Sequence, residues 1–124
     1  MQLRVLPDHY AIVRLDPGSE LPDWVDKGPF RSVTRTEHEV SVVCRDHDVP
    51  TGESAERGWR VLEVIGPLDF SLVGIVAALV VPLSEVEIPV FVVSTFETDY
   101  LLVREADVEA ACEALEDAGH AIAA

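Results

Sequence analysis

The sequence predicts a mixed α+β fold in which a ferredoxin-like βαββαβ unit follows a shorter, truncated βαββ half. Residues 59–124 alternate between strand-like and helix-like hydropathy in the order β-α-β-β-α-β, which is typical of an antiparallel sheet with both helices on one face. Residues 1–58 repeat the first part of that series without a convincing second long helix. We therefore expect two halves that meet near Gly58 and fold as one cooperative unit.

The second half begins with a strand from Trp59 to Ile65, where apolar positions alternate and β-branched side chains are frequent. Gly66-Pro67 breaks this strand, and a helix is expected from Ser71 because apolar residues then recur at helical spacing. Pro82 must kink or end that helix, since proline cannot donate to the carbonyl four residues earlier. The remaining predicted elements are a strand over 88–94, a turn over 95–98, a strand over 99–104, a helix over 105–118 and a short strand over 120–124.

The first half contains fewer and shorter elements. A strand is expected over 10–15, at most a short helix over 21–25, and a hairpin formed by strands over 30–36 and 39–45. A sheet with so little helical cover buries a small core by itself, so we expect it to depend on the other half.

The net charge of the chain excludes several classes of partner. The 124 residues include 9 Lys+Arg and 23 Asp+Glu, which gives a formal net charge of −14. Nucleic acids and anionic membranes attract clustered basic side chains, and the sequence has no such cluster. The longest apolar run, 72–83, is shorter than the roughly 20 residues that span a bilayer. Because no apolar signal region is visible near the N-terminus, we expect a cytoplasmic protein without nucleic-acid or membrane partners.

Two segments together predict a small-molecule site: the loop and helix start over 66–75, and the hairpin tip over 94–100. The expected fold brings both to one edge of the sheet. First-turn N–H groups of a helix lack internal partners, so the helix start favours a carboxylate. Gly74 has no Cβ and lets a ligand approach the backbone, while Asp99 suits an ammonium group. Hydroxyl partners are available from Ser94, Thr95 and Thr98.

Structural roles for the same residues remain open at this point. Gly74 can serve helix–sheet packing, and Asp99 can satisfy backbone N–H groups of its own turn. Phe70 and Phe96 fit core or interface positions better than ligand contacts. The two tryptophans, Trp24 and Trp59, are expected to pack at the joint of the halves or to form an exposed partner site.

These segments also carry a family resemblance. Residues 70–75 with Pro82-Leu83, and residues 94–103, resemble an ACT domain, and residues 30–36 and 39–44 resemble the half that precedes it in one ACT subfamily. That subfamily includes stand-alone bacterial proteins and the cytosolic arginine sensors of the TORC1 pathway. By this resemblance, residues 59–124 form an ACT domain and residues 1–58 an ACT-like half.

The resemblance implies a non-catalytic regulatory module that binds an amino acid where units associate, and hence a homodimer. The arginine sensors carry acidic residues just before the glycine, whereas this chain has Ser71-Leu72, so the resemblance does not identify arginine as the ligand. The alternative is a protein–protein interaction module that has lost ligand binding. The expected ligand-binding residues are Ser71, Gly74, Ile75, Val76, Thr95, Phe96 and Asp99.

Catalytic and metal-binding patterns are not found in the sequence. Asp46-His47-Asp48 lies in a polar loop without metal-ligand spacing, and Lys27 is not part of a phosphate-binding loop. Cys44 and Cys112 are too far apart in sequence for a CxxC motif and are expected to be buried small apolar residues. We therefore expect no enzyme activity, no metal and no cofactor. An enzymatic site would need a pocket that joins a histidine to Asp99 or to a cysteine.

Overall fold

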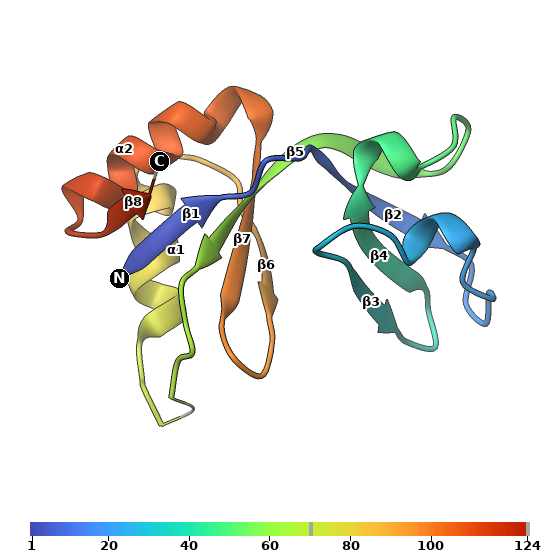
Figure 1. Cartoon of the computed structure of the whole chain (residues 1–124), viewed down its shortest axis with the longest axis horizontal. Coiled ribbons are helices and arrows are strands. Elements are labelled where there is room, and N and C mark those ends of the chain that lie inside the picture. The colour runs from blue at the N-terminus through green and yellow to red at the C-terminus, as the bar shows by residue number, and fades with distance from the viewer. Residues whose placement is uncertain (70, 124) are drawn as a thin grey trace. The chain divides into compact units, whose positions relative to one another are not determined.

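Strands and helices follow one another along the chain largely as the sequence predicts (Figure 1). The structure is a computed structural model that describes residues 1–69 and 71–123. The elements of these residues are β1 (Gln2–Val5), β2 (Tyr10–Leu15), η1 (Asp23–Val25), β3 (Ser32–Arg35), β4 (Val40–Arg45), η2 (Asp46–Asp48), β5 (Ala55–Val64), α1 (Ile75–Glu85), β6 (Phe91–Ser94), β7 (Asp99–Arg104), η3 (Glu105–Asp107), α2 (Val108–Asp117) and β8 (Ala121–Ala123).

The chain divides into two compact units. The N-terminal unit is Asp8–Trp59, and the C-terminal unit combines Met1–Pro7 with Arg60–Ala124. Strand β5 therefore begins in one unit and ends in the other. The assignment of residues 1–58 and 59–124 to two domains stays a prediction. In the structure, Met1–Pro7 belongs to the C-terminal unit, which the sequence analysis did not predict.

Strand β1 explains that difference. It pairs antiparallel with β5, with Leu3 opposite Val64, and parallel with β8, with Leu3 opposite Ile122. The sheet of the C-terminal unit thus has the strand order β6-β7-β5-β1-β8, and it is mixed rather than purely antiparallel. The strand has only four residues, too few for a period-two pattern to stand out in the sequence.

One hydrophobic core joins both helices to the sheet of the C-terminal unit. Leu79 and Leu83 of α1 and Leu115 of α2 are fully buried against side chains of β1, β5 and β7. These strand residues alternate in sequence, as in Leu62 and Val64, so both helices cover one face of the sheet. The predicted ferredoxin-like α+β fold is confirmed.

Helix α1 differs from the prediction at its start and at its proline. It begins at Ile75 rather than Ser71, because Gly74 adopts a left-handed conformation with φ 75° that a helix cannot continue. Pro82 lies inside the helix and does not end it. Proline removes the donor that would pair with the carbonyl of Ala78. The ring Nε2 of His120 lies 2.9 Å from that carbonyl oxygen and takes the place of the missing donor.

The N-terminal unit is a small antiparallel sheet with little helical cover. Its strand order is β3-β4-β2-β5, and the expected short helix is the single 3-10 turn η1. Its core is formed by small apolar side chains with Trp24 packed against them, while Trp59 is also buried. The proposed position of the two tryptophans at a joint stays a prediction. The buried core residues are Ala11, Val13, Val25, Val40, Val42, Cys44 and Val49.

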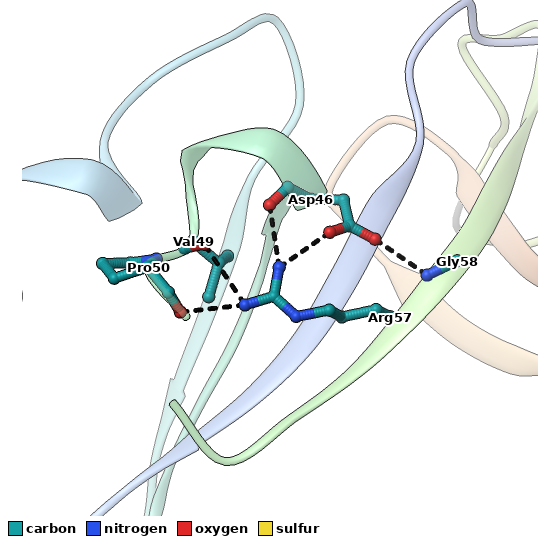
Figure 2. A network of polar contacts seen from close by, with 5 residues as sticks. All are labelled: Asp46, Val49, Pro50, Arg57 and Gly58. Atoms are coloured by element: carbon teal, nitrogen blue, oxygen red, sulfur yellow. Dashed lines mark hydrogen bonds and ion pairs between the residues drawn. The ribbon is translucent and has the colours of Figure 1, made fainter. Parts of the chain in front are cut away.

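A polar cluster fixes the start of β5 to η2 (Figure 2). The guanidinium of Arg57 donates to Asp46 Oδ1 at 2.8 Å and to the carbonyl oxygens of Asp46, Val49 and Pro50 at 3.1, 3.2 and 2.9 Å. The backbone N–H of Gly58 donates to Asp46 Oδ2 at 2.9 Å. The β2–β5 register shifts at this point, so the cluster, which we call the Asp46 clamp, holds an irregular strand segment in place.

Candidate functional site

The candidate site is a groove between the N-terminus of α1 and the β6–β7 hairpin, here called the α1–hairpin groove. Its volume is about 440 Å³. Six of the seven residues predicted to bind ligand line it; Ser71 does not, and Phe70 of the sequence motif lies outside the described residues. The lining residues are Leu68, Asp69, Leu72, Gly74, Ile75, Val76, Ala77, Ser94, Thr95, Phe96, Glu97, Thr98 and Asp99.

The helix wall of the groove presents unpaired backbone donors. The first internal hydrogen bond of α1 runs from the N–H of Ala78 to the carbonyl of Gly74 at 2.9 Å. The N-cap residue is Gly74, so no side-chain hydrogen bond caps the N-terminus of the helix. By helix geometry, the N–H groups of Ile75, Val76 and Ala77 therefore have no acceptor within the helix. All three residues line the groove, which gives this wall a partial positive charge.

The structure gives Gly74 a conformational role at the start of α1. It precedes the first helical turn, and its φ of 75° is a backbone conformation that favours glycine. A Cβ at this position would meet no atom within 4 Å, so neither helix–sheet packing nor a close neighbour requires glycine here. The glycine turns the chain into α1 and thereby exposes the helix N-terminus to the groove.

The hairpin wall presents a buried carboxylate. Asp99 is only 8% exposed and lies opposite Ser94 in the β6–β7 ladder, and its Oδ1 accepts a 2.5 Å hydrogen bond from the Ser94 hydroxyl. Thr95 satisfies the turn itself, because its Oγ1 accepts from the N–H of Thr98 at 3.3 Å. The N–H of Thr98 in the turn is thus satisfied by Thr95, while the Asp99 carboxylate bonds across the ladder to Ser94.

The floor of the groove is tied to the hairpin by contacts that the sequence did not reveal. The N–H of Leu68 donates to the carbonyl of Glu97 at 2.7 Å, and Thr98 Oγ1 donates to the carbonyl of Val64 at 2.7 Å. A Cβ on Gly66 would lie 3.0 Å from the carbonyl oxygen of Glu97, so this close approach requires glycine. Such backbone contacts leave no periodic pattern in a sequence.

Ser71 supports the loop instead of lining the groove. Its N–H and its hydroxyl both donate to Asp69 Oδ1 at 2.8 Å. These two hydrogen bonds lower the pKa of the Asp69 carboxyl. The loop before α1 is thus ordered around an aspartate that itself lines the groove.

The groove combines negative charge with apolar surface. Three carboxylates line it, those of Asp69, Glu97 and Asp99, and its described lining contains no Lys or Arg. Phe96 lines the groove and is 79% exposed, so it is not a core residue of the described chain as one expectation had it. A helix N-terminus on one side and a carboxylate on the other suit a molecule that carries both a negative and a positive group.

Reactive groups are not brought into this groove. Its described lining contains no histidine and no cysteine, and residues 1–69 and 71–123 hold no cluster of three or more His, Cys, Asp or Glu placed to bind a metal ion. Cys44 is fully buried, and burial raises the pKa of its thiol to about 11, while Cys112 is half-buried. Over the part of the chain described, none of the helices has the length and apolar character needed to cross a membrane.

Comparison with known proteins adds a family and several similar structures. A model of the ACT domain matches residues 54–117, and a model of an N-terminal domain family matches residues 8–52. A structural-genomics crystal structure from Agrobacterium tumefaciens is 40% identical, with 98% of this chain and 91% of that chain covered and a TM-score of 0.93.

Two more distant structures share the fold. A Vibrio cholerae protein of unknown function, described as a possible transport protein, is 18% identical over 91% of this chain and 85% of its own, with a TM-score of 0.75. The aspartate kinase of Clostridium acetobutylicum, an allosteric enzyme, is 13% identical over 90% of this chain and 33% of the kinase, with a TM-score of 0.69.

Proposed function

The chain belongs to the ACT-domain family, and from this premise we propose that it binds a free amino acid in the α1–hairpin groove. ACT domains commonly act as small-molecule-binding regulatory modules, as in aspartate kinases. The observation that carries the proposal is the pairing of an uncapped helix N-terminus with the buried carboxylate of Asp99 across one groove. An amino acid offers a carboxylate to the first and an ammonium to the second.

The charge of the groove selects among amino acids. An acidic side chain would face Asp69, Glu97 and Asp99 without a compensating cation in the lining, so aspartate and glutamate are disfavoured. Neutral and basic side chains avoid this repulsion, and Leu72, Ile75 and Val76 provide apolar contact. The proposed ligand is therefore a neutral or basic amino acid. Membership in the arginine-sensor subfamily stays a prediction.

We further propose that the protein is a homodimer in which a second copy covers the groove. Phe96 and Val73 are mostly exposed, and Leu72 and Val76 are 51% and 40% exposed beside them. An apolar rim around a ligand groove favours closure by a partner surface. Ligand binding then shifts the equilibrium of assembly and regulates without catalysis, in the cytoplasm.

Isothermal titration calorimetry with the twenty amino acids tests the proposal. Asp99→Asn removes the charge that faces the ligand ammonium and keeps the side-chain volume, so it should weaken binding by about tenfold or more, or about 1.4 kcal/mol. Asp117→Asn removes the same charge at an exposed position outside the groove lining and serves as the control. No heat of binding with any of the twenty compounds at millimolar concentration would contradict the proposal.

An interaction module without a ligand is the second candidate, and the exposed apolar rim favours it. In that case the protein would dimerise through the rim with no response to amino acids. Phe96→Ser measured by sedimentation velocity separates the two candidates when it is combined with the calorimetry: a rim-dependent dimer without ligand binding supports the module. Gly74→Val is unsuitable for this purpose, because valine at a positive φ strains the backbone in either case.

A further inference from the structure

A second groove of about 320 Å³ lies on the face of the C-terminal sheet opposite the helices, and we call it the rear groove. Arg4, Glu63 and Tyr100 line it, one from each of the strands β1, β5 and β7. Each of these residues alternates with core residues that contact the helices, so their side chains point to the other face. Glu97 and Thr98 line both grooves.

The polar side chains of the rear groove are already ordered. Arg4 and Glu63 are directly opposite in the β1–β5 ladder, and Arg4 Nε donates to Glu63 Oε1 at 2.6 Å. The Tyr100 hydroxyl bonds to the same carboxylate, and burial, then the charges of Glu63 and Glu97, raise its pKa while Arg4 lowers it. One cation, two carboxylates and one hydroxyl therefore line the same groove.

The walls of the rear groove are fixed by the backbone. The strands that carry Arg4, Glu63 and Tyr100 are three adjacent strands of the sheet. The remaining wall is the segment from Ile65 to Pro67, which the close approach of Gly66 to Glu97 and Thr98 holds against the hairpin. A site built on such elements needs little reordering when a ligand enters.

Two charged groups of the rear groove, the Arg4 guanidinium and the Glu97 carboxylate, are available to bind a ligand. Arg4 bonds to Glu63 through Nε, and its side chain is 57% exposed, so the guanidinium is accessible to a ligand as well. The Glu97 carboxylate forms no ion pair with any residue that the structure describes. A guanidinium edge favours a carboxylate, and a carboxylate favours an ammonium.

We propose that the rear groove is a second ligand site, which takes a small zwitterion with its carboxylate on Arg4, its ammonium on Glu97 and the Tyr100 hydroxyl between them. A simple anion would face the carboxylates of Glu63 and Glu97, and a simple cation would face Arg4. A zwitterion pairs with both charges, so among an anion, a cation and a zwitterion the proposed ligand is the zwitterion. Occupation of the α1–hairpin groove is not needed for this site to fill.

The test compares zwitterions with their two halves by ¹⁵N NMR titration. The probes are glycine and 4-aminobutanoate, with acetate and ethylamine as the single-charge controls. All titrations use the Asp99→Asn background, so that a response of the rear groove is separated from binding in the α1–hairpin groove. We expect the amide signals of Arg4, Glu63 and Tyr100 to shift saturably with a zwitterion, and acetate and ethylamine to bind at least about tenfold more weakly.

Matched variants complete the test. Arg4→Gln should weaken zwitterion binding by about tenfold, while Arg14→Gln, which removes an exposed arginine from the N-terminal unit, should leave it unchanged. Glu97→Gln, at an exposed position, should weaken binding of the zwitterion but not of acetate. Unresponsive rear-groove amides, equal binding by acetate alone, or full binding by Arg4→Gln would each overturn the proposal. Failure of amino-acid binding in the wild-type α1–hairpin groove would leave this result unaffected.

Discussion

The Asp46 clamp and the α1–hairpin groove both contain partly or fully buried aspartates, but the surroundings of these carboxylates differ. In the clamp, both carboxylate oxygens of Asp46 accept hydrogen bonds, from Arg57 and from Gly58. In the groove, three carboxylates line a surface that has no lysine or arginine in its described lining. A matched carboxylate stabilises the fold, whereas an unmatched one creates a place for a cationic group. The contrast separates a structural aspartate from a binding aspartate.

The largest expected effect on stability is in the clamp. Asp46→Ala removes the acceptor for Arg57 and for the N–H of Gly58, and it should lower the free energy of unfolding by about 2 kcal/mol. Urea denaturation measures this loss. Asp16→Ala is the control: it breaks an exposed ion pair with Arg14 and should change the stability by less than about 0.5 kcal/mol. Equal effects of the two variants would refute a special role for the clamp.

Asp99→Asn should mainly weaken ligand binding, whereas Asp46→Ala should mainly lower stability. The amide keeps an oxygen that accepts from Ser94, so the fold should lose less stability than in Asp46→Ala, while amino-acid binding should fall by about tenfold. Calorimetry and urea denaturation on the same variant provide both values. A variant that unfolds easily but binds normally would place Asp99 with the structural aspartates.

Two glycines of the groove sharpen the comparison further. Gly74→Ala should cost about 1 kcal/mol of stability through its positive φ alone, and Gly74→Asn should cost less because asparagine tolerates that conformation. Gly66→Ala should instead act through contact, since its Cβ would lie 3.0 Å from the Glu97 carbonyl oxygen. Thermal unfolding of the three variants distinguishes the two mechanisms: a loss in Gly74→Asn as large as in Gly74→Ala would rule out the conformational one.

The smallest expected effect is a loss of stability at alkaline pH that depends on the Cys44 thiol; at neutral pH this loss does not occur. Burial first, and then the charges of Asp48 and Asp46, raise the pKa of this thiol from 9.0 to about 11. The folded state therefore binds this proton more tightly, and the associated stability is complete below pH 9.0 and is lost as the pH rises toward 11. Urea denaturation against pH should show a shallower alkaline decline for Cys44→Ala than for the wild type. Identical slopes would mean that Cys44 does not contribute.

Local patterns predicted most of the elements, and their limits have physical causes. The strand over 99–104 and the helix ending near 118 are set by periodic apolar residues, and the structure agrees closely. The β1 strand was missed because its four residues gain stability only from pairing with β5 and β8, which are distant in sequence. The helix start was misplaced because a left-handed Gly74 is a backbone state that apolar spacing does not reveal.

The candidate site was predictable where it depends on residue type and hidden where it depends on tertiary contact. Gly74, Thr95 and Asp99 were expected together, and the structure brings them to one groove. Gly66 and Leu68 lie in the predicted segment 66–75, but their backbone contacts with Glu97 were not expected, because such contacts depend on tertiary structure. Ser71 was expected to bind ligand, but its partner in the structure is Asp69.

The most direct test of amino-acid binding in the α1–hairpin groove is an ¹⁵N NMR titration of the wild-type protein with the amino acid that calorimetry identifies. The amide signals of Ile75, Val76 and Ala77 should shift saturably, with the same dissociation constant that calorimetry gives, because the ligand carboxylate accepts from this first turn of α1. If these three amides do not move while the ligand binds, the carboxylate is held elsewhere and the proposed site is wrong.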